Sequence, residues 1–251
     1  MLRSRDLTWD GCLNVRDLGG HPVEGGGETQ FGRIVRADKV GRLSKEGWQA
    51  LVDYGIRTII DLRTDEERAA DPPADVPLEA LHVKFMDDTP DVFAAADKAS
   101  LAAPDLVAAT RDVYLIFLEA FRSNVAAVIE AVADAPDGGV VVHCAGGKDR
   151  TGLTVAFLLR LAGVGLEEIA ADYALSEERL RPRHEQWLAD AADDEERERL
   201  RRLTVTPAAS MVGVLEELER RYGSVEEFLV AGGAREGIGE RIRKRLAEAS
   251  L

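Results

Sequence analysis

Short apolar runs rich in β-branched residues recur along the first part of the chain, with helical patterns between them. Strand-like lengths and residue types occur at 32–36, 58–63, 80–85 and 140–142. The run at 58–63 is typical of a parallel strand buried on both faces. Residues 44–55 instead place Trp48, Leu51 and Val52 on one face of a helix. Strands that alternate with helices predict an α/β fold with a mainly parallel central sheet flanked by helices.

The next stretch changes from a polar pattern to a helical one. Residues 86–105 are polar and Ala-rich and contain two prolines, so we expect a mobile loop there. Over 105–133, apolar residues recur at spacings of three and four, which predicts a helical region that Ser123-Asn124 can divide in two. Before this stretch, Thr64 with Glu67 has the sequence of a capping box and predicts a short helix.

The chain is helical in pattern from Gly163 to its end. One helix is expected over Leu166–Ala174, and the highly charged segment Ser176–Leu203 follows it, with Pro182 inside. Gly232-Gly233 then separates a last amphipathic helix. These segments predict a helical C-terminal region.

The size and charge of the chain narrow its possible partners. It has 251 residues and 45% hydrophobic content, which is enough for one sizeable core, and no break in composition requires a second domain. The formal net charge is −14, from 32 Lys and Arg against 46 Asp and Glu, which argues against nucleic acid or an anionic membrane as a partner. Any site for an anion therefore needs positive charge gathered locally.

The cysteines and the N-terminus indicate a cellular compartment. Cys12 and Cys144 are the only cysteines, so there is no disulfide framework and a reducing compartment is expected. Residues 1–6 lack the apolar run of a signal peptide, and no apolar stretch is long enough to span a bilayer. We therefore expect a cytoplasmic protein without an integral membrane segment.

The strongest chemical signal lies between the strand at 140–142 and an apolar helix that begins at Thr151. The connection reads HCAGGKDR, with Cys144 near its start and Arg150 at its end. A free cysteine has a pKa of about 8.5, and a helix N-terminus or a nearby cation lowers it. A thiolate placed there can attack phosphorus. The segment predicts a phosphate-ester hydrolase that works without a metal or another cofactor.

The same loop offers groups that can hold a phosphoryl group. Its backbone amides can point inward as an anion nest at the helix N-terminus. Two of its glycines allow positive φ and a close approach to the ligand. The expected phosphate-binding residues are Ala145, Gly146, Gly147, Lys148 and Thr151.

Three further side chains have expected roles around the sulfur. Arg150 supplies a planar fork that suits two phosphoryl oxygens better than Lys does. The Thr151 hydroxyl can donate to the thiolate and later help it leave, and His143 can orient the loop through a ring hydrogen bond. Transfer to sulfur would give a cysteinyl-phosphate, which water hydrolyses. A carboxyl group must protonate the leaving oxygen and later activate that water.

The motif HCAGGKDRTG resembles a known family. It has the Cys-x5-Arg-Thr/Ser signature of protein tyrosine phosphatases, and its Lys148-Asp149 pair resembles the bacterial atypical tyrosine and lipid phosphatases, also called triple-specificity phosphatases. Residues 14–20 resemble that family's N-terminal motif. Residues 33–38 and 60–63 then follow in the expected order.

The resemblance covers about residues 10–165 and implies one phosphatase domain over 1–251 with a protein tyrosine phosphatase-like fold. Residues 166–251 would be a helical extension, of which Ser176–Leu203 can form a lid over the site. The implied substrates are phosphotyrosine proteins, phosphoserine and phosphothreonine proteins and phospholipids such as phosphoinositides, with phosphate as the product and no metal.

Three places remain for the general acid. The resemblance favours Asp149 inside the loop, which Arg150 would also tend to keep ionised. Asp87 or Asp88 lie where related phosphatases place an acid on a mobile loop. Asp61, at the end of its strand, is the third candidate.

Other polar residues near the motifs have supporting interpretations. Lys148 can bind substrate, including a second phosphate, or can be an ordinary surface lysine. Ion pairs that support the site are expected from Arg16, Asp17, Arg36, Asp38 and Arg63. Cys12 is expected to be structural, although it could trap oxidised Cys144 as a disulfide. The remaining histidines, His21, His82 and His184, lack metal-ligand spacing and are expected to be surface or packing residues.

Three other functions compete with a tyrosine phosphatase. One is a phosphoinositide or small-molecule phosphatase, which Lys148 keeps open. Another is a non-catalytic phosphate-binding module, against which the intact Cys144, Arg150 and Thr151 argue. A rhodanese-type sulfurtransferase also uses a loop cysteine, but the Lys-Asp-Arg-Thr ending suits hydrolysis of a dianion better.

Overall fold

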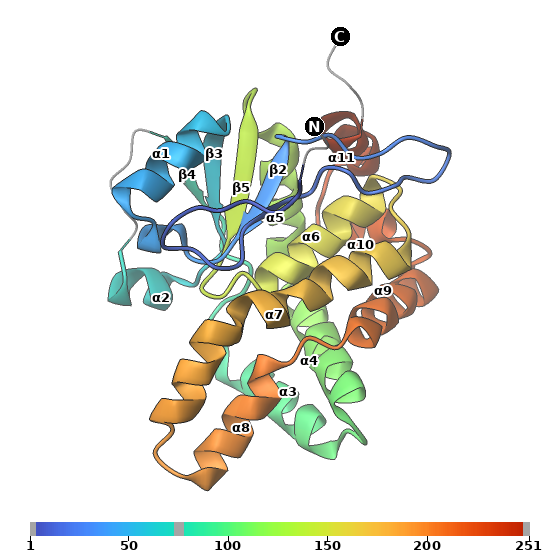
Figure 1. Ribbon diagram of the computed structural model, residues 1–251. Helices are drawn as coiled ribbons and strands as arrows, with labels where there is room; N and C mark the ends of the chain where they lie inside the picture. The colour runs from blue at the N-terminus through green and yellow to red at the C-terminus, as the bar shows by residue number, and fades with distance from the viewer. Residues whose placement is uncertain (1–3, 73–77, 248–251) are drawn as a thin grey trace.

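The structure is a computed structural model that describes residues 4–72 and 78–247. The strands of this described part are β1 (Arg16–Asp17), β2 (Ile34–Ala37), β3 (Ile56–Asp61), β4 (Glu79–His82) and β5 (Gly139–His143). Its helices are η1 (Val40–Arg42, 3-10), α1 (Lys45–Asp53), α2 (Asp65–Ala70), α3 (Pro90–Ala102), α4 (Leu106–Ala120), α5 (Arg122–Asp134), α6 (Arg150–Leu161), α7 (Leu166–Asp190), α8 (Asp194–Thr204), α9 (Ala208–Tyr222), α10 (Val225–Ala231) and α11 (Ile238–Leu246). Figure 1 shows the sheet in the upper part of the molecule, with α3, α4, α7 and α8 extending below it.

The strands form one sheet in the order β1-β2-β5-β3-β4. β2, β5, β3 and β4 run parallel, and only the short β1 pairs antiparallel among the described strands. The mainly parallel sheet predicted from the sequence is therefore confirmed. Because the carboxyl ends of parallel strands lie at one edge, the segments that follow these strands meet there. The segment after the central strand β5 is the loop that contains Cys144.

Alternating side chains of β5 face two separate cores. Val140 and Val142 pack into the larger core, which also takes the apolar faces of α5 and α6. Val141 packs into the second core, together with Leu51 of α1. Helices therefore bury both faces of the sheet, which explains why its central strands are almost wholly apolar.

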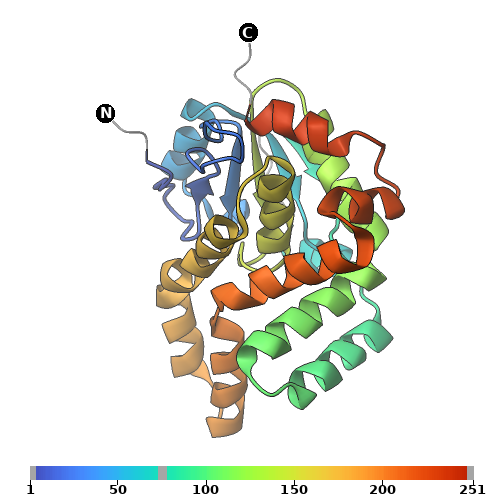
Figure 2. The same cartoon turned by 90° about the vertical axis from the view of Figure 1, so that its right-hand side faces the viewer.

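The expectation of a mobile loop over 86–105 is wrong, because Pro90–Ala102 forms α3. Pro90 occupies the first turn of the helix, where its missing N–H leaves no bond unmade. The alanines that follow are strong helix formers. Phe93 then packs on Phe117 of α4, with ring centroids 5.4 Å apart. Proline and alanine thus begin and fill a helix here rather than a loop, and Figure 2 shows α3 and α4 as a hairpin below the sheet.

The C-terminal region is helical as predicted, with one difference in its boundaries. The separation expected after Ala174 is absent from the described chain, because α7 runs for 25 residues from Leu166 to Asp190 and includes Pro182. Tyr173 and Leu180 are both buried, so one apolar face continues through the expected break. Upstream, α4 and α5 divide at Phe121, just before the predicted Ser123-Asn124. No described helix has the length and apolar content needed to cross a membrane.

Candidate active site

The loop at 144–149 connects β5 to α6 and contains the predicted nucleophile. Cys144 is 2% exposed, and the Gly147 amide donates to its Sγ at 3.2 Å. The loop runs directly into the N-terminus of the buried helix α6, where the helix dipole favours an anion. Within the described chain, the other amides between Cys144 and α6 have no protein acceptor. They are therefore available to an anionic ligand.

Side chains behind the loop hold its carbonyl groups outward. Asn14 Nδ2 donates to the carbonyl oxygens of Gly146 and Gly147, at 3.3 and 3.0 Å. Arg36 Nη2 also donates to the Gly147 carbonyl, at 2.7 Å. In a trans peptide unit the C=O and N–H point in opposite directions. Fixing the Gly146 carbonyl outward therefore directs the Gly147 amide inward, toward the sulfur.

The two loop glycines differ in their backbone conformation. Gly147 has φ of +65°, as expected, but Gly146 does not have positive φ, so that expectation is corrected. A Cβ at position 147 would lie 2.4 Å from the carbonyl oxygen of Ala37, at the end of β2. At position 146 the nearest atom would be Lys148 Cβ, at 4.0 Å. Of these two positions, only 147 requires glycine, because its φ is positive and the backbone of β2 lies close to it.

Substituting each glycine with alanine should therefore destabilise the protein at position 147 and have little effect at position 146. We expect Gly147→Ala to cost more than about 1 kcal/mol of stability, because its backbone is strained and its Cβ meets β2. The displaced loop should also lower kcat/KM about 100-fold. Gly146→Ala, the matched variant, should melt close to the wild-type temperature. Thermal denaturation of both variants checks this, and equal melting temperatures would contradict it.

A buried charged cluster lies behind the loop. Asp172 of α7 accepts from Arg16 Nε at 2.7 Å and from Arg36 Nη1 at 2.5 Å, and all three side chains are almost fully buried. Burial, followed by repulsion from Arg36, lowers the pKa of Arg16 to about 10, so it remains charged at neutral pH. Burial alone would raise the pKa of Asp172, but the two guanidinium groups outweigh this and hold it well below its usual range. Two positive charges against one negative leave one positive charge behind the anion site.

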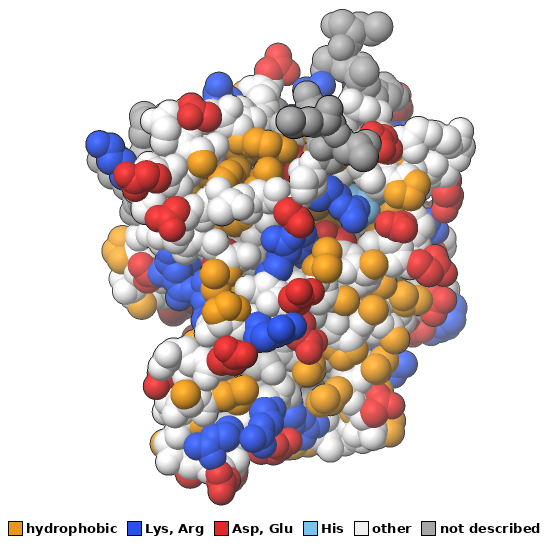
Figure 3. Space-filling model, viewed as in Figure 1, with side chains coloured by type: hydrophobic (Ala, Val, Ile, Leu, Met, Phe, Trp, Pro, Cys, Tyr) orange, Lys and Arg blue, Asp and Glu red, His pale blue; other side chains and the backbone are white. Residues whose placement is uncertain are grey.

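This local charge contrasts with the outer surface. The face drawn in Figure 3 carries acidic and basic side chains side by side around apolar patches, in a protein of formal net charge −14. A phosphate ester approaching the acidic body would be repelled at long range. The positive charge that the sequence analysis required is thus inside the fold, directly behind the loop.

Arg150 is held by a carboxylate that the sequence analysis assigned only to a helix cap. Both terminal nitrogens of its guanidinium donate to Glu67 of α2, one of them at 2.7 Å. Glu67 also accepts from the Thr64 amide at 2.8 Å, which completes the predicted capping box. Burial alone would lower the pKa of Arg150, but the Glu67 carboxylate together with the charges of Cys144 and Asp149 outweighs burial and raises it. Glu67 thereby fixes the guanidinium plane beside the loop.

The in-loop carboxylate and its neighbour Lys148 also have partners. The Tyr114 hydroxyl, from α4, donates to Asp149 Oδ1 at 2.5 Å. Lys148 Nζ donates to the carbonyl oxygen of Leu203 near the end of α8, and lies 3.5 Å from Asp149 Oδ1. α8 thus contacts the loop directly through Lys148.

A cavity of about 610 Å³ opens over the loop. Its polar lining includes Cys144, Asp149 and Arg150, together with Asp88, Lys148 and His184. Its apolar wall comes from Phe85, in the connection after β4, and from Phe93, Phe117, Leu180 and Trp187 on the helices below the sheet. The cavity can therefore take an anionic group at the sulfur and an apolar group beside it.

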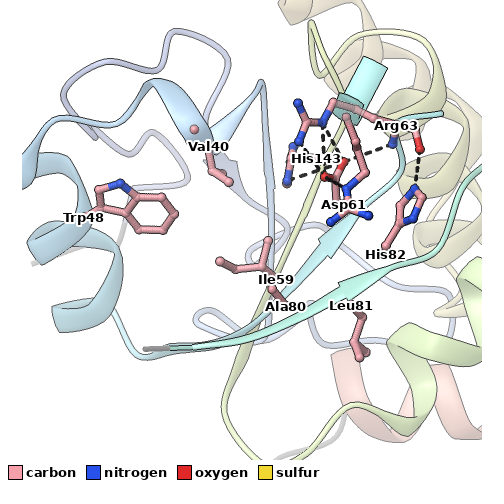
Figure 4. A pocket seen from close by; sticks show the side chains of 11 residues that line it. Val40, Trp48, Ile59, Asp61, Arg63, Ala80, Leu81, His82 and His143 are labelled. Atoms are coloured by element: carbon pink, nitrogen blue, oxygen red, sulfur yellow. Dashed lines mark hydrogen bonds and ion pairs between the residues drawn. The ribbon is translucent and has the colours of Figure 1, made fainter. Parts of the chain in front are cut away.

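Two acid candidates, Asp61 and Asp87, lie away from this cavity's lining. Asp61 is buried and pairs with Arg63, at 2.8 Å. Both line a smaller cavity on the α1 side of the sheet, shown in Figure 4 with His82 and His143. Asp87 pairs instead with Lys84, at 2.6 Å. Asp149 and Asp88 are the acid candidates that line the large cavity.

His143 and Thr151 differ in how far their geometry matches expectation. His143 Nδ1 lies 3.1 Å from the Cys144 carbonyl oxygen, and burial lowers the pKa of the imidazole. The neutral ring is therefore in place to orient the loop. Thr151 Oγ1 is fully buried and has no hydrogen-bond partner among the described residues, so no bond to Cys144 is formed in this state.

Cys12 lies behind the loop and donates to the Lys39 carbonyl oxygen at 3.5 Å. Burial, and next the charge of Asp38, raises the pKa of its thiol. A thiol kept protonated is a poor nucleophile. Burial and the neighbouring Asp38 therefore favour a structural role for Cys12.

Asp38 forms an ion pair as expected, and Asp17 accepts hydrogen bonds. Asp38 pairs with Arg183 at 2.6 Å and accepts from the Asn14 amide at 2.9 Å. Asp17 accepts from the Gly19 amide at 2.6 Å, which shapes the turn after β1.

The role of Tyr114 and the pairing of Glu67 with Arg150 were not predicted from the sequence. Both side chains come from elements distant in sequence from the loop. Glu67 had a local explanation in the capping box, and Tyr114 sat in an amphipathic helix. A polar hydroxyl within the apolar stripe of α4 was the available signal.

Comparisons with known proteins place the chain in a family. Residues 7–248 match the tyrosine phosphatase family. The chain is 30% identical over 226 residues to a tyrosine-protein phosphatase of Nostoc commune, covering 86% of this chain and 74% of the relative. It is 28% identical over 276 residues to the triple specificity protein phosphatase PtpB of Mycobacterium tuberculosis, covering 93% and 96%. The chain therefore belongs to the tyrosine phosphatase family.

Proposed function

We propose that this protein-tyrosine phosphatase works through a cysteinyl-phosphate on Cys144. The observation that carries the proposal is the loop whose carbonyls are bound from behind, while an inward amide contacts the Cys144 sulfur at 3.2 Å. Such a nest offers donors to the sulfur and to the three non-bridging phosphoryl oxygens. Asn14 and Arg36 hold the loop carbonyls outward through protein contacts alone, which preorganises the nest.

In the first step the Cys144 thiolate attacks phosphorus. The S–P bond forms and the P–O bond to the substrate breaks, while the Asp149 carboxyl gives its proton to the leaving oxygen. In the second step Asp149 takes a proton from water, the water oxygen bonds to phosphorus and the S–P bond breaks. Free phosphate is released, and the Cys144 thiolate and the protonated Asp149 are restored. Arg150 stabilises the charge that spreads over the phosphoryl oxygens in both steps.

Asp149 is assigned as the acid because of its place and its partner. It lines the cavity that contains the sulfur, and Tyr114 holds one carboxylate oxygen and leaves the other for the substrate. Asp88 is the alternative, since it lines the same cavity. The buried Thr151 hydroxyl has no hydrogen-bond partner among the described residues, so it can donate to the thiolate.

The proposed substrates are phosphotyrosine proteins, with phosphoserine and phosphothreonine proteins as further substrates. The apolar wall beside the sulfur suits an aromatic ring. Phosphoinositides are the alternative substrates. The Lys148 ammonium can bind a second phosphate once its hydrogen bond to the Leu203 carbonyl is broken.

Trapping the intermediate tests this proposal. Wild-type protein is mixed with p-nitrophenyl phosphate, phosphotyrosine and phosphoserine peptides or a phosphoinositide, quenched with acid and weighed by mass spectrometry. We expect an added phosphoryl group on the peptide that contains Cys144. Cys144→Ser should lower kcat at least about 10⁴-fold. Cys12→Ser, the matched control, should retain activity. Turnover that survives Cys144→Ser would overturn the proposal, and phosphate binding without turnover in the wild type would favour a binding module.

A further inference from the structure

Two buried tyrosines connect the in-loop carboxylate to the helices outside the loop. Tyr114 of α4 donates to Asp149 Oδ1 at 2.5 Å, and its oxygen lies 2.8 Å from the hydroxyl of Tyr173 of α7. Both tyrosines are less than 5% exposed. A tyrosine has one hydroxyl proton. Because Tyr114 uses its hydroxyl proton in the hydrogen bond that it donates to Asp149, Tyr173 must be the donor to Tyr114.

The packing around the pair fixes where these hydroxyls point. The two rings meet edge to face, with centroids 6.2 Å apart. The Tyr173 ring also lies against Gly152 in the first turn of α6, where an added Cβ would be 3.0 Å from its Cδ2. The pair is therefore anchored to the same helical turn that begins with Arg150. Burial, and next the Asp149 charge, raises the pKa of Tyr114 well above its ordinary value, so it remains a donor.

We propose that Tyr114 and Tyr173 form a hydrogen-bond relay that positions Asp149 for proton transfer. The inference rests on the proposed role of Asp149 as general acid. When the carboxyl gives its proton to the leaving oxygen it becomes a carboxylate, the form that a hydroxyl donor stabilises. A chain of two donors polarises cooperatively and strengthens this bond. By holding Oδ1, the relay leaves Oδ2 to face the leaving group. Tyr114 is thus a positioning residue, since it acts through Asp149.

The relay predicts a defect that depends on the leaving group. p-Nitrophenolate leaves with little help from an acid, whereas phenolate needs the proton. We expect Tyr114→Phe to lower kcat/KM for phenyl phosphate about tenfold and to change kcat/KM for p-nitrophenyl phosphate less than about threefold. The comparison uses kcat/KM because it reports the first step, whereas hydrolysis of the cysteinyl-phosphate is common to both esters. Tyr173→Phe should show the same selectivity with a smaller loss. Asp149→Asn should show the largest selective loss, and adding Tyr114→Phe to it should cost nothing more.

Steady-state kinetics on the two esters test the relay, with melting temperatures as a check of folding. Tyr222→Phe is the matched control, because its hydroxyl donates to the Glu119 carboxylate at 2.7 Å, among α9 and α4 residues that do not line the cavity. It should leave both rates unchanged. If Tyr114→Phe does not fold, Tyr173→Phe carries the test.

Each contrary result has a separate meaning. Equal losses on both esters, or losses that add to those of Asp149→Asn, would overturn the relay and indicate only a packing role. A selective loss in Asp149→Asn with wild-type kinetics in both tyrosine variants would overturn the relay and leave the acid assignment standing. No selective loss in Asp149→Asn would overturn the acid assignment and the relay together, while dependence on Cys144 would still hold.

Discussion

Arg150→Lys is expected to lower kcat/KM on the order of 10³-fold, although the charge is kept. Lysine carries one compact ammonium, whereas the arginine fork can bind Glu67 with its two terminal nitrogens and still present remaining N–H groups to the phosphoryl oxygens. The loss should appear in kcat more than in KM, because the fork matters most when charge spreads in the transition state. Steady-state kinetics on p-nitrophenyl phosphate measure the split.

Two variants show whether the fork itself is responsible. Arg160→Lys makes the same change at the other end of α6, where the guanidinium binds Glu219 at 2.6 Å, and should keep wild-type kinetics. Glu67→Gln keeps Arg150 but weakens its anchor, so its loss should be smaller than that of Arg150→Lys. Wild-type kcat in Arg150→Lys would show that Arg150 does not stabilise the transition state.

The sequence was informative where one short segment contains both the chemistry and its context. The Val140–Val142 run, the glycines and Arg150 lie within a dozen residues, so local pattern was enough to place a loop between a strand and a helix. The parallel sheet was predicted in the same way from local pattern, because short apolar runs rich in β-branched residues are typical of parallel strands buried on both faces.

Partners that come from distant elements could not be read from local pattern. Tyr114 meets Asp149 across 35 residues of chain, and Asp172 meets Arg36 across 136. Tertiary packing decides such contacts, and a single sequence shows only that each residue is polar within an apolar helical face. The helix α3 was missed for a different reason, since Ala-rich composition with proline fits both a loop and a helix N-terminus.

The contacts behind the loop give one explanation for several scattered residues. Asn14 lies just before β1, Arg36 lies on β2 and Asp172 on α7. Arg16 joins Asn14 to Asp172, and Asp172 accepts from Arg36. Asn14 and Arg36 both donate to the Gly147 carbonyl. An acidic protein can thus hold an anion, because one uncompensated positive charge is placed behind the amides that would bind it. The same arrangement makes the fold depend on Asp172.

Asp172→Asn is expected to cost about 3–5 kcal/mol of stability, because two buried guanidinium groups lose their counter-charge. The Asp172 pKa is lowered in the folded state, so its stabilisation is complete above the ordinary aspartate range near about pH 4 and is lost as the pH falls below it. The difference in unfolding free energy between wild type and variant should therefore be large at neutral pH and shrink in acid. Urea denaturation at a series of pH values measures it.

Asp134 supplies a control that separates burial from pairing. It also bridges two arginines, Arg235 and Arg241, but its side chain is 55% exposed. Water screens such a pair, so Asp134→Asn should cost less than about 1 kcal/mol. If Asp172→Asn lowered stability no more than Asp134→Asn, the loss of Asp172 would not leave two guanidinium charges without a counter-charge inside the fold. A large loss at Asp172 alone would show that this single buried carboxylate partly neutralises the two guanidinium groups behind the loop, and that the fold depends on it.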